Sequence, residues 1–557
     1  MRGYFLKKIL SKIDDIDIRP IDIAIVSLLV LLICVVNVTN QDLVVSPDLR
    51  FLYNRATQMY KCLCDGNIPF FYYDDFGGVG YGSSFFYGDL TLYPFLFTVK
   101  FGIKKFLLAY TSTTIILTYL GASYFAKRFT KSYKFTALIY MCCAYTLQSF
   151  YMFGTYANLL AIAISFFFLA KCVDFFRDNK SFIPASILFF IILNTHSVTA
   201  LLSFILCCII MIFYFSKDKF FSYIKFASVT CLICSYFIIN MIYHSDILTS
   251  IENINKAMLD YAKRGDISVI SNYMSYLPMI GTVELLILTL VGIDIGVTGY
   301  RLFNLTLTIV LIALFIKRIK TFSKKEVICL FSIIFSLVIA ERHIWVFLNS
   351  IYQTHIQFPI RYMPYSILIL LIILFRYLDK RWVKVVTFTF CLLDCFLIGF
   401  MTSGIVDKEQ YNDLFCQVEN GEYLDKSFVW KTDTFHYYSS HVIDQDGAEY
   451  DYTSNKGVVT IKFKGNSSNI KSLLLPKLYY KGYECYYIDK SGSLDEKKYL
   501  PVTKGYSQFI KVDMTDFKGD YICLRYKHPN LLVLLWVFCD CTVLFLMIYK
   551  LGFRKRR

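Results

Sequence analysis

The chain has 557 residues and is 56% hydrophobic and 18% aromatic, whereas an ordinary soluble protein is roughly 45–50% apolar. The apolar residues are gathered into blocks, and Lys and Arg lie between the blocks. This pattern excludes a soluble fold and is typical of helices that span a membrane. The formal net charge is +16, and the basic residues behind it lie in short loops and at both termini. Their positions therefore indicate how the chain is oriented in the membrane, and nucleic acid is not an expected partner.

Basic clusters recur after alternate apolar blocks, and both termini are basic. Because cytoplasmic loops of membrane proteins are enriched in Lys and Arg, we expect both termini in the cytoplasm and an even number of spans. About twelve blocks meet this condition: 21–38, 106–126, 135–153, 156–170, 182–195, 198–215, 226–243, 302–316, 327–340, 362–375, 385–401 and 531–549. The first block lacks a clean cleavage site, so we interpret it as a retained signal anchor.

The block 285–297 is apolar but contains Asp294. Counting it as a span would break the even number, so we place it on the outer surface or as a re-entrant segment. Three large segments are then expected outside the membrane, at 39–105, 244–301 and 402–530.

The segment 402–530 is predicted to be a domain of its own. It is charged throughout, and Val459, Ile461 and Phe463 alternate with polar residues, which is the period of a β-strand. Together these features predict an α-helical polytopic membrane protein with a C-terminal extracytoplasmic β-sandwich. Its parts are a multi-span domain at 1–401, the β-rich domain at 402–530, and a last helix with a basic tail at 531–557.

The first outer segment holds the leading candidates for catalysis. Asp48 follows the first span closely, and Asp74 and Asp75 lie in a stretch rich in glycine and aromatic residues. Carboxylates can act as general bases, and aromatic side chains suit the faces of sugars. Arg50 and Arg55 in the same segment suit an anionic lipid substrate. The alternative is that this segment only covers the membrane surface, with its acidic side chains in water and its aromatic side chains at the lipid–water interface.

A second candidate group lies at the expected outer ends of later spans. Its members are polar or basic and are predicted to bind substrate: His196, Arg342, His343, Gln357 and Arg361. The planar guanidinium of arginine suits a lipid phosphate at this depth. The alternative is that the arginines reach to lipid headgroups and the histidines are hydrogen-bonded within the bundle.

Two acids, Asp394 and Asp540, fall inside expected spans. An ionised carboxylate is costly there, so a proton or ion pathway is conceivable. No internal repeat accompanies them, and we rank a lipid or polysaccharide transporter below an enzyme.

Three stretches in chain order resemble the YfhO-like bacterial membrane proteins of the GT-C glycosyltransferase superfamily. They are Asp48-Leu49-Arg50 with the glycine-aromatic stretch that follows, Gln357-Phe358-Pro359-Ile360-Arg361-Tyr362, and Leu475-Pro476-Lys477-Leu478-Tyr479-Tyr480-Lys481-Gly482-Tyr483. The chain departs from this pattern at Pro47, Ile360 and Tyr483, where related proteins often carry His, Trp and Trp.

The resemblance implies an enzyme of the bacterial cytoplasmic membrane that takes a sugar from a polyprenyl-phosphate carrier to a cell-envelope polymer or lipid. Asp48 would be the general base or a ligand of a divalent cation, with Asp74 and Asp75 in reserve as the base. Arg342 and Arg361 would neutralise the phosphate. A non-catalytic envelope scaffold that binds polymer is a third class of function.

Overall fold

The computed structural model describes residues 20–39, 47–73, 75, 78–151, 155–245, 363–377, 381–382, 384–389, 450–464, 470–489, 496–505 and 508–552. The expected spans 302–316 and 327–340, most of 385–401, and the ambiguous block 285–297 lie outside these residues. The total of twelve spans therefore stays a prediction.

The described residues form two compact units. Residues 20–52, 100–231 and 363–389 make up the helical unit, and residues 53–99, 232–245 and 450–552 make up the mixed unit. The mixed unit thus joins most of the first predicted outer segment to the β-rich region, although the two are far apart in the sequence.

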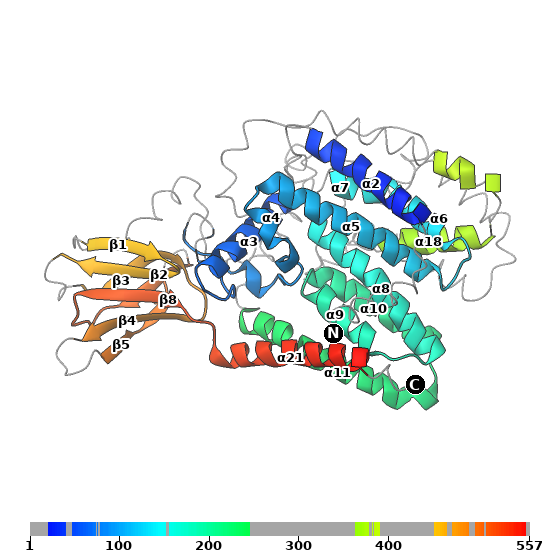
Figure 1. Ribbon diagram of the computed structural model, residues 1–557. Helices are drawn as coiled ribbons and strands as arrows, with labels where there is room; N and C mark the ends of the chain where they lie inside the picture. The colour runs from blue at the N-terminus through cyan, green and yellow to red at the C-terminus, as the bar shows by residue number, and fades with distance from the viewer. Residues whose placement is uncertain are drawn as a thin grey trace, which may run out of the picture. The chain divides into compact units, whose positions relative to one another are not determined.

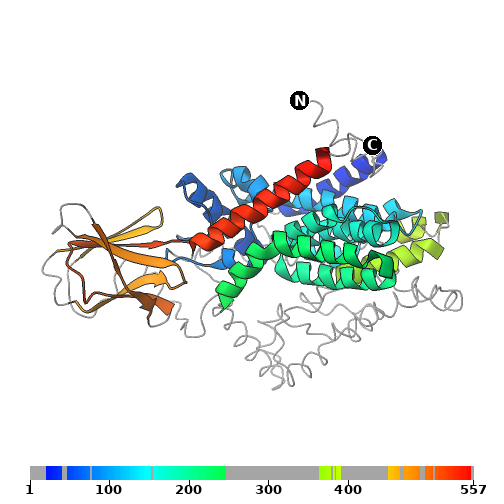
Figure 2. The same cartoon turned by 90° about the horizontal axis from the view of Figure 1, so that it is seen from below.

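The helical unit includes α2 (Pro20–Thr39), α5 (Ile103–Ala126), α6 (Tyr133–Met141), α7 (Ala144–Tyr151), α8 (Tyr156–Asp178), α9 (Ile183–Leu193), α10 (Ser197–Phe213) and α18 (Met363–Tyr377). Helix α5 packs on α8, α6 and α2, while α8 also packs on α9 and α10 (Figures 1 and 2). Gly121 permits a close approach, because a Cβ there would lie 2.6 Å from the carbonyl oxygen of Ala163. Small residues at helix contacts are typical of membrane bundles.

Four helical segments among the described residues are long and apolar enough to cross a membrane: Ile103–Ala126, Tyr156–Asp178, Lys217–Tyr243 and Asn530–Lys550. These four helices indicate a membrane protein. Two details differ from the sequence prediction. The expected span 135–153 is divided into α6 and α7, and α8 continues beyond residue 170 to Asp178.

The mixed unit begins within α3 (Pro47–Cys64) and continues through η2 (Ser83–Phe85), η3 (Tyr93–Phe95) and α4 (Leu96–Val99). It also contains the end of α11 (Phe220–Tyr243), which follows η4 (Lys217–Lys219), and the last helix α21 (Asn530–Gly552). Cys539 of α21 donates a hydrogen bond to the carbonyl oxygen of Leu232 in α11 at 3.4 Å.

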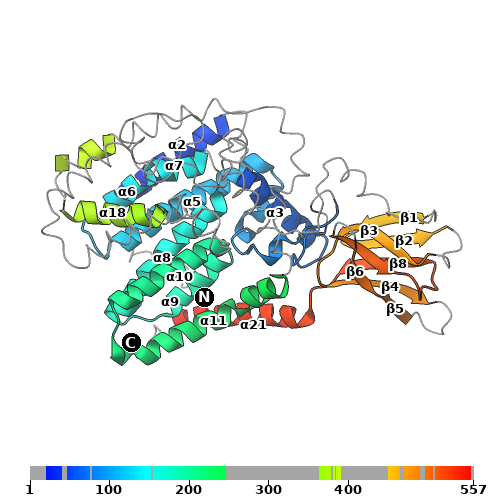
Figure 3. The ribbon, with the colours of Figure 1, turned by 180° about the vertical axis from the view of Figure 1, so that it is seen from behind.

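Eight strands form two antiparallel sheets in the mixed unit. The larger has the order β1 (Tyr450–Asn455), β2 (Val458–Phe463), β8 (Tyr521–Tyr526), β4 (Tyr483–Asp489) and β5 (Glu496–Leu500), so β1 and β5 are its edges (Figure 3). The smaller has the order β3 (Ser472–Leu478), β7 (Phe509–Asp513) and β6 (Val502–Lys504).

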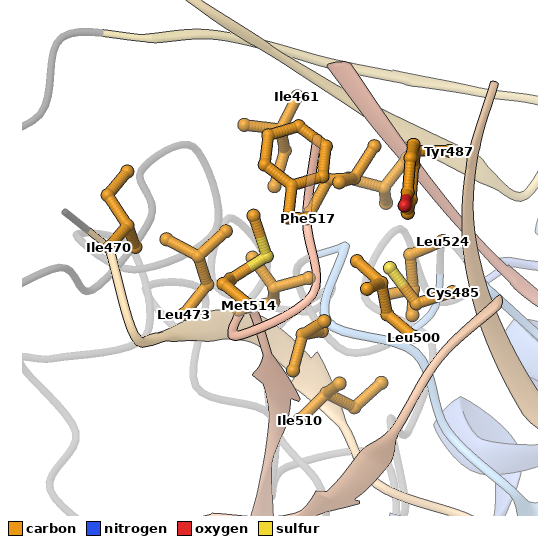
Figure 4. Close-up of a cluster of buried hydrophobic side chains, with 14 of the residues drawn as sticks. Ile461, Ile470, Leu473, Cys485, Tyr487, Leu500, Ile510, Met514, Phe517 and Leu524 are labelled. Carbon is orange, nitrogen blue, oxygen red and sulfur yellow. The ribbon is translucent and has the colours of Figure 1, made fainter. Parts of the chain in front are cut away.

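Both sheets contribute to one hydrophobic core (Figure 4). Ile461 from the larger sheet and Leu473 and Ile510 from the smaller sheet are among its buried members. The predicted alternation in β2 is confirmed, since Val459, Ile461 and Phe463 are buried and Lys462 is exposed. The C-terminal region is therefore an antiparallel sheet region with its own core.

Candidate functional site

The candidate site is the acidic and aromatic segment that begins with α3. Pro47 and Asp48 open this helix, and proline suits a first helical turn because its missing N–H has no partner to lose there. An acidic residue in the first turn also interacts favourably with the helix dipole. The backbone thus places Asp48 and Arg50 on the first turn of α3, while their side chains lie outside the description.

Arg55, further along α3, is buried in a closed polar network. Its guanidinium forms an ion pair with Asp89, donates to the carbonyl oxygen of Gly88 at 3.1 Å, and lies 4.9 Å from the ring centre of Tyr87. The hydroxyl of Tyr72 donates to the second carboxylate oxygen of Asp89. The contacts give Arg55 a structural role within the segment, and its contact with substrate stays a prediction.

Burial and charge act in opposite directions on this network. Burial alone lowers the pKa of Arg55, but the negative charge of Asp89, with smaller contributions from Tyr72 and Tyr87, outweighs it and raises the pKa. The pKa of Tyr72 is raised well above its usual value by burial and then by Asp89. Arg55 therefore stays charged and Tyr72 stays protonated at neutral pH.

Asp75 is a buried carboxylate held by α3. The side-chain amide of Asn54 donates to Asp75 Oδ1 at 2.6 Å. The backbone is held as well, because the Asp75 N–H donates to the carbonyl oxygen of Tyr72 at 3.3 Å and the Gly80 N–H donates to the Asp75 carbonyl oxygen at 3.0 Å. Of the two reserve candidates for the base, Asp75 is thus placed by the fold, and Asp74 lies outside the described residues.

The segment that carries Asp75 is fastened to strand β3. Lys477 is buried, and its ammonium group donates to the carbonyl oxygen of Tyr73 at 3.2 Å and to that of Gly78. The Leu478 N–H donates to the carbonyl oxygen of Val79 at 2.9 Å. The glycine-aromatic stretch after α3 and the stretch at β3 therefore contact each other directly, although they are far apart in the sequence.

Aromatic rings fill the space between these two stretches. Phe71 stacks on Tyr526 at a centroid distance of 4.6 Å, and Phe85 lies 5.6 Å from Tyr480. Gly82 is required here, because a Cβ would lie 2.6 Å from the Tyr480 ring and 2.7 Å from the Phe85 ring. The rings are buried against one another, so they hold the segment in place.

Two histidines that the sequence analysis did not single out as candidates join this aromatic cluster. His244 stacks on Phe85 with a centroid distance of 3.9 Å and an interplanar angle of 6°, and neither of its ring nitrogens has a hydrogen-bond partner among the residues that the structure describes. His528 stacks on Phe70 at 4.4 Å. Burial lowers the pKa of His244 to about 3, with smaller contributions from His528 and Lys481, and lowers that of His528 to about 4. Both rings are neutral at neutral pH.

His196, the predicted substrate-lining histidine, is the N-cap of α10 in the helical unit. Its Nδ1 accepts from the Thr199 N–H at 3.2 Å, and the Thr199 hydroxyl donates to Asn158 Oδ1 at 2.8 Å. The signal for this role lies in the sequence, because Asn194, Thr195 and His196 end one apolar block just before the next begins. A role in substrate contact stays a prediction.

The remaining predicted substrate-binding residues, Arg342, His343, Gln357 and Arg361, lie outside the described residues. The distance from Asp48 to the two arginines is therefore untested. Within the described part of the chain, no group of three or more His, Cys, Asp or Glu side chains could hold a metal ion.

The described residues thus combine an acidic helix start, a buried carboxylate positioned by an amide, and an aromatic cluster that joins them to the β-rich region. This arrangement holds the segment next to the Asp75 carboxylate. Comparison of the chain with protein-family models, with curated proteins and with solved structures finds no match.

Proposed function

We propose that the chain is a membrane glycosyltransferase that moves a sugar from a polyprenyl-phosphate carrier to a cell-envelope polymer or lipid acceptor. The proposal includes a GT-C-like fold of twelve spans in a bacterial cytoplasmic membrane with both termini in the cytoplasm. It also takes the two C-terminal sheets as a β-sandwich on the outer side.

One observation carries the proposal: the acidic segment after α2 is folded and anchored. Helix α3 begins at Pro47, shortly after α2 ends at Thr39, and it carries Asp48 at its start. Further along, α3 holds Asp75 through Asn54. A base that removes a proton from a hydroxyl must be held within hydrogen-bond reach of it, and rigid elements provide such placement better than loops.

In the proposed reaction, the Asp48 carboxylate accepts the proton of an acceptor hydroxyl. The acceptor oxygen attacks the anomeric carbon of the sugar, the bond from that carbon to the carrier phosphate oxygen breaks, and the phosphate keeps the electron pair. Arg342 and Arg361 are proposed to stabilise this phosphate. Attack from the face opposite the phosphate inverts the anomeric centre.

The test uses purified full-length protein in lipid nanodiscs with labelled polyprenyl-phosphate sugars and an envelope extract as acceptor. Asp48→Asn is expected to lower transfer by about 10²- to 10⁴-fold, the range for loss of a general base. Asp451→Asn, at an exposed residue of β1 paired with Lys464, is the matched control and should transfer at the wild-type rate. Full transfer by Asp48→Asn would exclude Asp48 as the base.

A non-catalytic envelope scaffold is favoured by a different observation. Arg55 and Asp89 form an ion pair with each other and hydrogen bonds with neighbouring groups. Such contacts suit a segment with a structural role. A scaffold predicts no effect of Asp48→Asn on envelope glycans, whereas deletion of 402–530 would change the envelope.

A further inference from the structure

The ends of α5 and α8 in the helical unit form a cationic cluster around one buried carboxylate. Asp174 forms ion pairs with Arg128 at 2.7 Å, with Lys171 at 3.7 Å and with Lys180 at 3.7 Å. Only about 5% of the Asp174 side chain is exposed. The cluster of three cations and one carboxylate therefore has an excess of two positive charges.

All three guanidinium nitrogens of Arg128 form hydrogen bonds within this cluster. Its Nε donates to Asp174 Oδ1 at 3.0 Å and to the Ala170 carbonyl oxygen at 3.2 Å, and its Nη2 donates to Asp174 Oδ2 at 2.7 Å. Its Nη1 donates to the Tyr124 carbonyl oxygen, and the guanidinium stacks 3.8 Å from the Tyr124 ring centre. Arg128 therefore holds α5 against α8.

The two lysines keep capacity for another partner. Lys171 donates to the Tyr124 hydroxyl, and Lys180, just past the end of α8, is 61% exposed. Both lie 3.7 Å from Asp174, which is beyond ordinary hydrogen-bond distance. Each ammonium group has three donors, so a further acceptor can be bound. The neighbouring Arg177 and Asp178 pair with each other and add no net charge.

The position of the cluster at the ends of two candidate spans indicates which hydrogen-bond acceptor the lysines bind. Arg128 lies just after the end of α5, and Asp174 lies in the last two turns of α8, both of which are candidate spans. Ends of membrane-spanning helices lie at the level of lipid headgroups, where Lys and Arg attract anionic lipids.

We propose that Lys171 and Lys180 bind the phosphodiester headgroup of an anionic phospholipid at this end of α5 and α8. The headgroup phosphate supplies the negative charge that Asp174 alone does not provide. The site is independent of sugar transfer and would tie the α5–α8 contact to the lipid composition of the membrane.

The test measures binding of phosphatidylglycerol and phosphatidylcholine to the purified full-length protein in neutral detergent by native mass spectrometry. Wild type is expected to prefer phosphatidylglycerol. Lys171→Gln/Lys180→Gln should weaken that binding by about 25-fold, roughly fivefold for each lysine near the headgroups. The matched control is Lys104→Gln/Lys105→Gln, which removes two exposed lysines at the opposite end of α5 and should bind as wild type does.

Equal affinity for the two lipids, or equal losses in the two double variants, would overturn the proposal. A large excess of inorganic phosphate is included as a separate arm, and complete displacement of the lipid by phosphate would assign the site to a free anion and overturn it too. If the double variant does not fold, Lys180→Gln alone changes only an exposed side chain, and a loss of about fivefold is expected.

Discussion

Two arginine–aspartate pairs in this chain have the same components, but the network around one is neutral and the network around the other carries a net positive charge. In the mixed unit Arg55 pairs with Asp89 beside the Tyr87 ring, and in the helical unit Arg128 pairs with Asp174 beside the Tyr124 ring. In the part of the chain that the structure describes, Asp89 also accepts a hydrogen bond from the neutral hydroxyl of Tyr72, so the network carries no net charge.

Asp174 instead attracts Lys171 and Lys180, so its network carries excess positive charge. A neutral network inside a folded segment supports structure, whereas an excess of charge at a membrane boundary attracts an anionic partner. An arginine–aspartate pair can thus leave its surroundings neutral or positively charged, depending on the groups that neighbour it.

The largest effect is expected from Asp89→Asn. This change leaves the Arg55 charge buried without its carboxylate, which should cost about 3–5 kcal/mol of unfolding free energy. Asp451→Asn, which breaks the exposed pair with Lys464, should cost below about 1 kcal/mol. Denaturant unfolding of the two purified variants measures the difference, and equal small losses would contradict a structural role for the Arg55 network.

Asp174→Asn should lower the free energy of unfolding by about 2–3 kcal/mol. This loss is smaller than for Asp89→Asn because Lys171 and Lys180 are partly exposed and stay hydrated when the carboxylate is removed. The loss of stability caused by Asp174→Asn should also depend on the lipid that surrounds the protein. Thermal unfolding in nanodiscs should show a smaller loss with phosphatidylglycerol than with phosphatidylcholine, since the anionic headgroup replaces the lost charge. For Asp89→Asn the same two membranes should give equal losses.

Acid is expected to weaken the mixed unit through its buried histidines. In the unfolded chain His244 and His528 take up protons near the ordinary pKa of 6.5, whereas the folded pKa values are about 3 and about 4. Stability is therefore complete above pH 6.5 and falls as the pH decreases below it, by about 2 kcal/mol per histidine at pH 5.

His244→Phe tests this pH dependence. Phenylalanine keeps the stack on Phe85 and removes two nitrogens that have no hydrogen-bond partner within the described part of the chain. Stability at pH 7.5 should therefore be maintained, and the loss on going to pH 5 should be reduced by about half. Thermal melts at the two pH values measure it. An unchanged pH dependence in this variant would show that His244 does not carry the effect.

The smallest effect is expected from Gly457→Ala. Lys456 and Gly457 turn the chain between β1 and β2 with φ values of 50° and 80°, and a Cβ on Gly457 would lie 2.8 Å from the Tyr73 ring. The change should cost about 1–2 kcal/mol. Ser454→Ala in the same hairpin is the control, and an equal loss there would contradict the contact argument.

The apolar blocks were predictable from their continuous hydropathy, and strand β2 was predictable because it buries one face. Strand β2 shows the alternation directly. The edge strands β1 and β5 were missed, since most of their residues are exposed and charged or polar, as edge strands commonly are. The extension of α8 was missed because the pairing of Asp174 with Arg128, which makes charged residues tolerable there, depends on a distant segment.

For the candidate site, the sequence predicted which segment is rich in acids and aromatic residues. It could not predict that Arg55 would be neutralised by Asp89, or that Lys477 would hold the carbonyl groups of Tyr73 and Gly78. These contacts join residues from different parts of the chain. Periodicity and composition report local structure, so contacts between distant segments leave no signal in them.

The most direct test of the proposed transferase is the composition of cell-envelope glycans in a strain that carries Asp48→Asn on the chromosome. Wild type, the gene deletion and Asp451→Asn are analysed beside it, with protein levels measured in the membrane fraction. We predict that Asp48→Asn and the deletion lack the same sugar while Asp451→Asn retains it. A wild-type glycan profile in the Asp48→Asn strain, with the protein present at its normal level, would contradict the account.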